Sequence, residues 1–248
     1  MSVKAKKQFE MGEQGELRYA NDGRVPHPEK PARSNPFRHC ILALNASLRN
    51  WIGSISVPKD SIVLDFGCSV MQYRSLFPVS CEYWGADLPG NELASVVIRD
   101  DGSLDLPDNC IDVVLSTQVL EHVQNPALYV SEAYRVLKPG GHMILTTHGL
   151  FVYHPDPEDN WRWTSNGLRR QIQAAGFEVV GIEGLIGPAA AAVQFLQDTT
   201  WHRVPRPFRK VYVALFQTFV GLLDSRYTTT GRIRDAWVYS TLSKKPLK

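Results

Sequence analysis

The segment IVLDFGCS, residues 62–69, has the composition of a buried β-strand that ends in a tight turn. Its first five residues are apolar except for Asp65, and Gly67 follows them directly. Continuous apolar strands of this kind are typical of parallel sheets that are covered by helices on both faces. In such sheets, ligands bind beyond the carboxyl ends of the strands. The segment therefore predicts the fold class and the edge of the sheet that carries a binding site.

Short apolar runs and helical patterns alternate along the rest of the chain, as expected for a parallel sheet with helices on its faces. Asn35 and Thr164 are good N-caps, and the sequence KPGG at 138–141 is expected to end the helix before it. The predicted strands are Ile62–Phe66, Tyr83–Ala86, Ser95–Ile98, Ile111–Ser116, His142–Thr147, Phe177–Ile182 and Ala236–Leu242. The predicted helices are Asn35–Ile52, Met71–Leu76, Pro126–Leu137, Ser165–Ala175, Gly187–Gln197 and Arg209–Leu223.

These elements predict an α/β fold with a doubly wound, mostly parallel seven-stranded sheet. An N-terminal helix precedes the sheet, and a helical insertion precedes its last strand. Residues 1–35 are polar and carry three closely spaced prolines, which predicts an arm or lid outside the core. Residues 36–248 form the main domain, in which residues 185–230 are the expected helical cap insertion.

The composition excludes several classes of protein. The 248 residues are 44% apolar and 21% charged, which excludes a chain that is disordered throughout. Four scattered cysteines without a C-x-x-C pair exclude a disulfide scaffold and give no metal signature. The net charge of +2 and the lack of a basic face interleaved with aromatics predict no nucleic-acid partner. The N-terminus has no apolar run of an export signal, so the expected location is the cytoplasm.

A second carboxylate, Asp87, ends the next predicted strand. It follows Gly67 by about 20 residues, the spacing at which an acidic side chain holds a ribose diol in nucleotide-binding sheets. Two carboxylates beside a glycine turn suit a nucleoside that carries positive charge. A pyrophosphate instead needs a G-x-G-x-x-G turn, and Gly67 is followed only by Cys, Ser, Val and Met. The residues therefore disfavour a nicotinamide cofactor.

Six segments, taken in order, resemble the class I S-adenosylmethionine-dependent methyltransferases, and most closely the broad group that includes ubiquinone- and sterol-methylating enzymes. The resemblance covers residues 61–182 and rests on the ordered set. The segments are VLDFGC at 63–68, AD at 86–87, DGSLDLP at 101–107, IDVVLS at 111–116, VLEHV at 119–123 and EAYRVLKPGG at 132–141.

This resemblance implies a Rossmann-like methyltransferase fold that takes S-adenosyl-L-methionine as its cofactor. Family enzymes often continue the first glycine as G-x-G-x-G, whereas Ser69 and Met71 occupy the later positions here, so the loop is expected to lie farther from the amino-acid moiety. The cofactor contacts that the resemblance implies are Asp65, Gly67, Cys68 and Ser69 for the methionine end, Ser116, Thr117 and Gln118 for the sulfonium, Asp87 and Leu88 for the ribose, and Asp101 (or Asp100) with Gly102 for the adenine.

The loop at residues 148–164 is the predicted acceptor site, because loops at this edge of α/β sheets carry specificity and catalysis. Methyl transfer to an alcohol benefits from a base that takes the hydroxyl proton. His148 or His154 is the predicted base, oriented by Asp156 or Asp159. His122 is expected to shape the site rather than to act as a base.

The residues after the fourth predicted strand indicate which kind of atom is methylated. Enzymes of the same broad fold that methylate amide or base nitrogens carry Asn-Pro-Pro-Tyr or Asp-Pro-Pro-Tyr there, whereas residues 116–119 read STQV. The long loop resembles methyltransferases of bacterial cell-surface polysaccharide and secondary-metabolite pathways. We therefore expect O-methylation of a sugar or lipid-linked glycan. The alternatives are a soluble small-molecule acceptor and a non-catalytic cofactor-binding module.

The apolar segment at residues 209–223 has two interpretations. It is shorter than the roughly 20 residues of a membrane span, which favours a buried cap helix. The alternative is an interfacial helix that contacts an acidic membrane through residues 203–223, because three arginines and a lysine precede or begin it. An apolar face that points outward would favour a membrane-bound substrate, and an inward face that closes a pocket would favour a soluble one.

Overall fold

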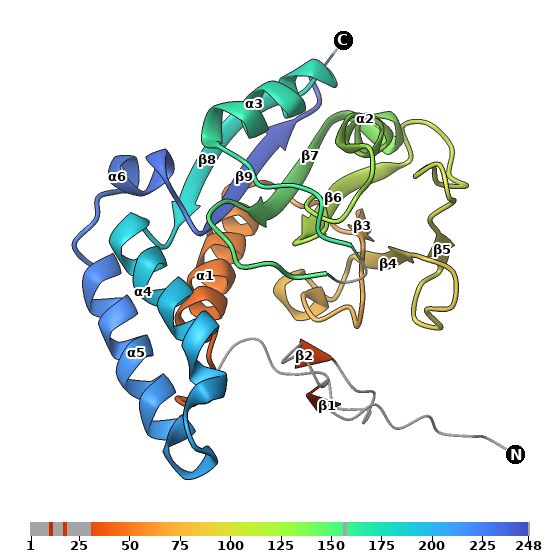
Figure 1. Cartoon of the computed structure of the whole chain (residues 1–248). Coiled ribbons are helices and arrows are strands. Elements are labelled where there is room, and N and C mark those ends of the chain that lie inside the picture. Colours follow the sequence, from red (N-terminus) through yellow and green to blue (C-terminus); the bar gives the residue numbers. More distant parts are fainter. Residues whose placement is uncertain (1–9, 12–16, 19–30, 156–157, 248) are drawn as a thin grey trace, which may run out of the picture.

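The computed structural model describes residues 10–11, 17–18, 31–155 and 158–247. Its main feature is a seven-stranded sheet in the order β5-β4-β3-β6-β7-β9-β8, in which only β9 runs antiparallel to its neighbours (Figure 1). A separate antiparallel pair joins β1 (Glu10–Met11) and β2 (Leu17–Arg18). The strands of the large sheet are β3 (Ile62–Phe66), β4 (Glu82–Asp87), β5 (Val96–Val97), β6 (Ile111–Thr117), β7 (Leu137–His148), β8 (Glu178–Leu185) and β9 (Val238–Lys244).

Helices cover both faces of this sheet. Local signals start two of them: the Asn125 side chain caps α2 and that of Thr164 caps α3, each by accepting backbone N–H groups of the first turn. The helices are α1 (Arg38–Ser54), α2 (Pro126–Val136), α3 (Ser165–Ala174), α4 (Pro188–Thr200), α5 (Arg209–Asp224) and α6 (Thr229–Arg234), with short 3₁₀ turns η1 (Arg74–Leu76), η2 (Trp201–Arg203) and η3 (Arg206–Phe208).

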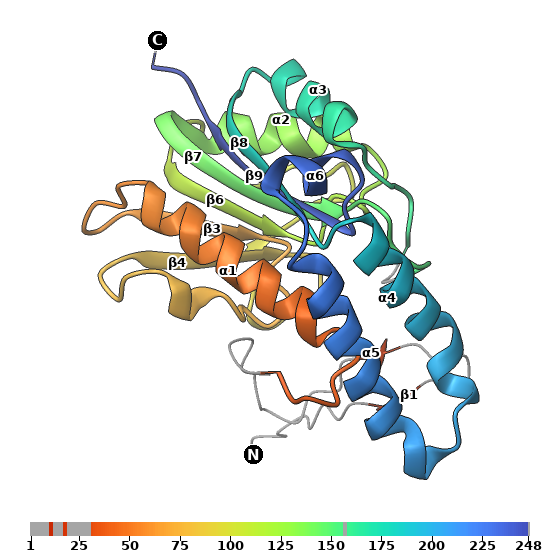
Figure 2. The same ribbon diagram turned by 90° about the vertical axis from the view of Figure 1, so that its left-hand side faces the viewer.

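The core is divided into two layers by the alternation of side chains along each strand. Figure 2 shows α1, α4 and α5 on one side of the sheet and α2 and α3 on the other. Leu64 and Phe66 point to the α2 and α3 side, whereas Val63 packs with Leu48 of α1 on the opposite side. All four of these side chains are fully buried. The seven-stranded, mostly parallel sheet predicted from the sequence is therefore confirmed.

Two local predictions were wrong. Residues 71–76 do not form an α-helix, because Met71 has a left-handed backbone (φ 52°) and only the single turn η1 follows. The predicted end of the helix before KPGG is confirmed, since α2 ends at Val136, but the next strand, β7, begins earlier than predicted and includes residues 138–141. Asn35 does not cap α1, which begins at Arg38; its side chain accepts the N–H of Phe37 in the preceding turn. The short helix α6 was not predicted.

Helices α4 and α5 with the turns η2 and η3 occupy most of the segment between β8 and β9, where the insertion at 185–230 was expected. Its role as a cap stays a prediction. Most of the predicted arm, residues 1–35, lies outside the described residues. Within the described part of the chain, the helices are all too short or too polar to cross a membrane.

Candidate functional site

The turn after β3 is held against β4 by its own backbone. The N–H groups of Gly67 and Cys68 both donate to the carbonyl of Ala86, at 2.8 and 3.0 Å. Gly67 has a φ of 86°, and a Cβ at this position would collide with the side chain of Val119. Both the conformation and the close approach require glycine. The turn is thus fixed in one shape, between Ala86 and Val119, at the carboxyl end of β3.

The two residues that replace the later family glycines keep a glycine-like backbone. Ser69 and Met71 have φ values of 44° and 52°, in the left-handed region that side chains rarely adopt. The Ser69 N–H donates to Asp87 Oδ2 at 2.9 Å, and the Met71 methyl group lies so close to Gly85 that a Cβ there would collide with it. The local contacts therefore stabilise a backbone that the residue types alone would disfavour.

Asp65 is a buried carboxyl group with one oxygen available. Its Oδ2 accepts the Tyr83 hydroxyl at 2.7 Å, while Oδ1 has no hydrogen-bond partner among the described residues. Burial raises the pKa of Asp65 to about 7; the Tyr83 hydrogen bond opposes this shift, and the negative charge of Asp87 adds to it. An unpartnered buried carboxyl oxygen fits a ligand that brings a hydrogen-bond donor or a positive charge.

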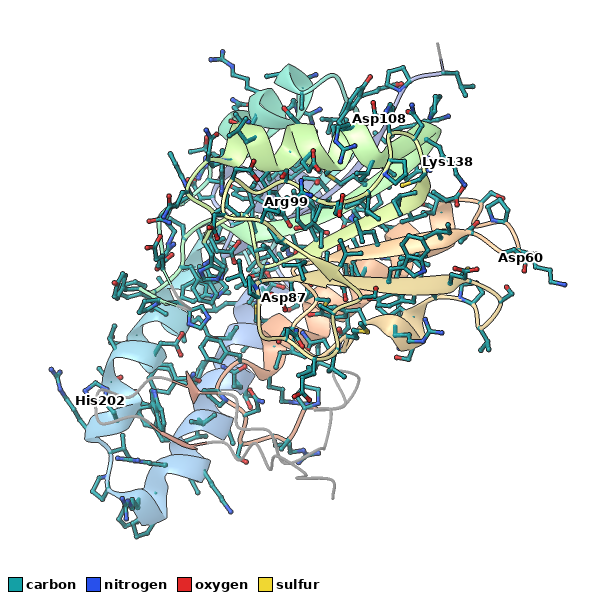
Figure 3. All side chains as sticks on the ribbon, turned by 90° about the vertical axis from the view of Figure 1, so that its right-hand side faces the viewer. Asp60, Asp87, Arg99, Asp108, Lys138 and His202 are labelled. Carbon is teal, nitrogen blue, oxygen red and sulfur yellow. The ribbon has the colours of Figure 1, made fainter. Side chains whose placement is uncertain are left out.

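Asp87 ends β4, on the strand beside Asp65, and Figure 3 labels it at the opposite end of the strands from Asp60. Its Oδ2 accepts from the Asn91 amide at 2.7 Å as well as from Ser69, and its Oδ1 accepts the Leu88 N–H at 2.8 Å. Burial and the charges of Asp65 and Asp87 together raise the pKa of the Cys68 thiol to about 12. The two carboxylates therefore act on one common turn and concentrate negative charge there.

The end of β6 places Thr117 and Gln118 beside this turn. Gln118 has a φ of 56°, and its backbone and side-chain N–H groups both donate to Thr146 of β7 at 3.0 Å. Ser116 does not face the same side as expected. Its hydroxyl is fully buried and hydrogen bonded to Tyr129 of α2 at 2.9 Å, because the alternation along β6 turns it toward the helix layer.

The residues predicted to contact the adenine, Asp101 and Gly102, lie in the loop after β5. The Asp101 carboxylate accepts from the backbone and hydroxyl of Ser103, at 2.9 and 2.6 Å, and these bonds lower its pKa. Gly102 has a φ of 83°, and nothing lies within 4 Å of the Cβ position it lacks. Asp101 thus stabilises its own turn, and the space beside the Cα of the neighbouring Gly102 is unoccupied by described residues.

Strand order sets the positions of these groups along one edge. Because β4, β3, β6 and β7 are neighbours in that order, Asp87, the Gly67 turn, Thr117 and His148 follow one another along the carboxyl edge of the sheet. Neighbouring strands are about 4.8 Å apart, so the row from β4 to β7 spans about 14 Å. The predicted cofactor contacts of β3, β4 and β6 and the predicted base are therefore brought to one edge.

His148 is paired with a buried glutamate that the sequence prediction did not include. Its Nε2 lies 3.1 Å from Glu121 Oε1, and Glu121 Oε2 accepts the Thr147 hydroxyl at 2.8 Å. Burial raises the pKa of Glu121 to about 8 and lowers that of His148 well below its usual value. His148 Nδ1 is buried and has no hydrogen-bond partner among the described residues.

Three histidine rings meet at this end of the sheet. Their centroids are 6.2 Å apart for His122 and His148, 6.0 Å for His148 and His154, and 5.7 Å for His122 and His154. Phe151 stacks on the His148 ring at 3.7 Å. His122 Nδ1 faces the backbone carbonyl of Glu158, so the long loop is tied to the segment after β6. The described residues hold no group of three or more His, Cys, Asp or Glu side chains able to bind a metal ion.

Asp159 was predicted to orient a histidine ring, and its contacts with Arg162 and with the backbone of His154 anchor the loop. Its two oxygens pair with the Arg162 guanidinium at 2.5 and 2.6 Å, and Oδ2 also accepts the backbone N–H of His154 at 2.7 Å. Asp156, the other residue considered for that role, lies outside the described residues. The Glu-His pair at 121–122 is the signal that could have drawn attention to Glu121, but nothing in the sequence joins it to His148.

Comparison with known proteins connects this geometry to one group of enzymes. The family model described as a methyltransferase domain matches residues 64–145. A probable S-adenosylmethionine-dependent methyltransferase of Mycolicibacterium smegmatis is 35% identical over 95 residues, which are 36% of this chain and 37% of that protein. The 2-methyl-6-phytyl-1,4-hydroquinone methyltransferase of Synechocystis is 23% identical over 214 residues, 73% of this chain and 66% of that protein. The matches thus span about one third and two thirds of these relatives.

Solved structures share the fold. Phosphoethanolamine N-methyltransferase 2 of Haemonchus contortus in complex with S-adenosyl-L-methionine superposes with a TM-score of 0.52 at 16% identity, over 82% of this chain and 52% of that one. A likeness at this identity shows the architecture, and the acceptor must be argued from the residues themselves.

Proposed function

We propose that this chain is a class I S-adenosylmethionine-dependent methyltransferase, which transfers a methyl group from this cofactor to a hydroxyl oxygen of a sugar or lipid-linked glycan. The observation that carries the proposal is the pair of carboxylates, Asp65 and Asp87, on neighbouring strand ends. A buried neutral histidine, His148, lies two strands away along the same edge. A cationic donor and a proton acceptor would thus lie side by side.

The residues present fit the cofactor. The unpartnered Oδ1 of Asp65 is available to the ammonium group of its methionine end, beside the backbone of Gly67, Cys68 and Ser69. The remaining proposed contacts are Asp87 and Leu88 for the ribose, Asp101 and Gly102 for the adenine, and Thr117 and Gln118 near the sulfonium. When bound, the cofactor supplies an electrophilic methyl group.

His148 is the proposed base. A neutral imidazole can accept the proton of an acceptor hydroxyl. Burial lowers the pKa of His148, which favours its neutral form. The unpartnered Nδ1 is the atom available for that proton, while Nε2 faces Glu121. Glu121 is then a positioning residue that holds the ring, and Asp159 holds the loop in which His154 lies. His154 is the alternative base, because its ring lies in the same cluster.

The proposed acceptor follows from the aromatic surroundings of His148. Tyr153 and Trp161 in the long loop are exposed, and flat aromatic faces pack well against the apolar faces of sugar rings. A row of rings also leads away from the site: Phe151 lies 4.8 Å from Trp237, and Trp237 lies 6.4 Å from Phe195 on the outer side of α4. Trp237 is fully buried, so the row is a packed connection from the long loop to α4, and only Phe195 at its outer end is exposed. The exposed Phe195 supports peripheral membrane contact next to residues 203–223 of a protein that acts in the cytoplasm.

A second candidate is a lipid-soluble or freely soluble phenol. It is favoured by the hydroquinone substrate in the name of the Synechocystis relative. Transfer of labelled methyl groups from the cofactor into fractionated bacterial extract separates the two. Label in the glycolipid or polysaccharide fraction supports the first proposal, and label in the quinone or soluble phenol fraction supports the second. Cofactor binding without any transfer would contradict both and leave a non-catalytic binding module.

Calorimetry with S-adenosylmethionine tests the cofactor site directly. Asp87→Asn keeps the size of the side chain and removes its charge, and we expect at least tenfold weaker binding, since charged hydrogen bonds contribute about 1.5–3 kcal/mol. Asp60→Asn is the matched control, because Asp60 is exposed and lies at the other end of the strands (Figure 3). Equal affinity of the Asp87→Asn variant and the wild type would overturn the assignment.

A further inference from the structure

The hairpin of α4 and α5 carries an apolar face that points away from the protein. α5 buries Val213 and Val220 on its inner side. Its outer side presents Phe208 at its start and then Val211, Leu215, Phe219 and Leu222, which are 49–64% exposed. Their spacing of three or four residues places them in one stripe along the helix. Exposed stripes of this kind mark interaction sites. Of the two interpretations of residues 209–223, the outward face is the one that favours a membrane.

Positively charged side chains predominate around this stripe. Residues 188–227 contain five Lys and Arg side chains but only two acidic ones, Asp198 and Asp224. Asp224 is buried and pairs with Arg232 and His39. Asp198 accepts the side-chain amides of Gln194 and Gln197 on its own helix. Four cations, Arg203, Arg206, Arg209 and Lys210, lie in the segment that joins the two helices and at the start of α5. Arg209 donates to the carbonyls of Val204 and His202, whereas Arg203, Arg206 and Lys210 are exposed.

A groove beside the stripe combines both features. It has a volume of about 420 Å³ and lies between α5 and residues 33–34. Val211, Ala214 and Leu215 line it, together with Thr218, and Arg33 and Lys210 add positive charge. Apolar walls with two cations fit an amphiphile that has an anionic headgroup.

We propose that α5 lies on an anionic lipid bilayer, with its outer stripe at the boundary of headgroups and acyl chains and with the cations on lipid phosphates. A helix of 16 residues is about 24 Å long and too short to span the bilayer, but it can lie in the interface. The proposal deepens the proposed function, since the row of rings from His148 ends at Phe195 on this hairpin.

Vesicle flotation with the full chain tests the proposal without cofactor or acceptor, so its outcome is independent of methyl transfer. We expect the wild type to float with vesicles containing phosphatidylglycerol, to stay behind with pure phosphatidylcholine, and to be released by salt. Arg203→Gln combined with Arg206→Gln should weaken binding roughly 25-fold, at about fivefold for each charge removed. Leu215→Ser combined with Phe219→Ser should weaken it at least about tenfold.

Matched variants elsewhere on the surface control for general effects. Leu128→Ser on α2 and Arg170→Gln on α3 remove an exposed apolar side chain and an exposed cation, and both should bind vesicles like the wild type. Lack of binding to anionic vesicles would overturn the proposal, and so would equal losses in the control variants. A stripe variant that changes the molecular mass in light scattering, and leaves vesicle binding intact, would instead identify the face as an interface between copies.

Discussion

The part of the sheet edge around Gly67 and Asp87, proposed to bind the methyl donor (the donor part), and the part around Glu121 and His148, proposed to bind the acceptor (the acceptor part), are built in different ways. The donor part joins β3 and β4 mainly through backbone N–H groups, which meet the carbonyl of Ala86 and the carboxylate of Asp87 within a short stretch of chain. The acceptor part joins Glu121, His148 and the long loop through side chains that are distant in sequence. The first is a rigid backbone cradle, whereas the second depends on a few buried side chains that substitution can remove one at a time.

Removing the proposed base should separate the two parts most sharply. His148→Ala is expected to lower turnover about 10²–10⁴-fold, the range contributed by general bases. Affinity for S-adenosylmethionine should be unchanged, because two strand positions separate β7 from the Gly67 turn. Steady-state kinetics and calorimetry on the same sample measure both quantities. If cofactor binding fell together with turnover, the two parts would be coupled and the comparison would fail.

Titration of Glu121 should make the acceptor part sensitive to pH. The unfolded carboxyl is ionised above pH 6.5, whereas burial keeps the folded one protonated up to its pKa of about 8. Unfolding between these values releases a proton, so rising pH should destabilise the wild type by about 1–2 kcal/mol. His148, whose pKa is lowered, contributes in the opposite sense and mainly below about pH 7. Glu121→Gln should remove the part of the slope that is due to Glu121, while Asp65 and Asp198, whose pKa values burial raises to about 7, keep a smaller part of it. Thermal unfolding midpoints at pH 6.5 and 8 measure it, and parallel curves for the two proteins would contradict the assignment.

The smallest expected effect concerns the donor turn. Ser69→Gly should stabilise the protein by about 0.5 kcal/mol, because relief of the left-handed backbone slightly exceeds the extra entropy of glycine in the unfolded chain. Ser225→Gly, at a residue with a φ of −61°, is the control and should be destabilising. Urea unfolding of the two variants gives the comparison. A loss of stability in the first would show that the Ser69 side chain, and not only its backbone, supports the turn.

The positions of the residues in the donor part could be predicted from the sequence because their determinants are local. Gly67 and Asp87 are readable from the order of strand, glycine and carboxylate, and the structure brings both to one turn. The helix predicted at 71–76 is absent because Met71 has a positive φ, a backbone conformation typical of glycine. The residue type gives no sign of this conformation. Ser116 was misplaced because a shift of one residue along a strand changes the face to which a side chain points.

The acceptor part shows the limit of sequence patterns. His148 could be chosen by residue type and by its place after a strand. Its neighbour Glu121 comes 27 positions earlier and meets it only because β6 and β7 pair side by side. The partner of Asp159 could not be predicted either. A carboxylate that is near a histidine in the sequence can equally well bind an arginine, and Asp159 binds Arg162. Pairing across strands decides between these roles.

The position of β9 has a consequence for how the protein is made. This strand lies between β7 and β8 and is hydrogen bonded to both along its length, yet it follows both of them in the sequence. Until the ribosome has released residues 238–244, β7 and β8 both expose unpaired edges. Such edges recruit strands from other chains. The sheet is thus completed only after β9 has been made, and stalled or truncated products lacking β9 are expected to aggregate.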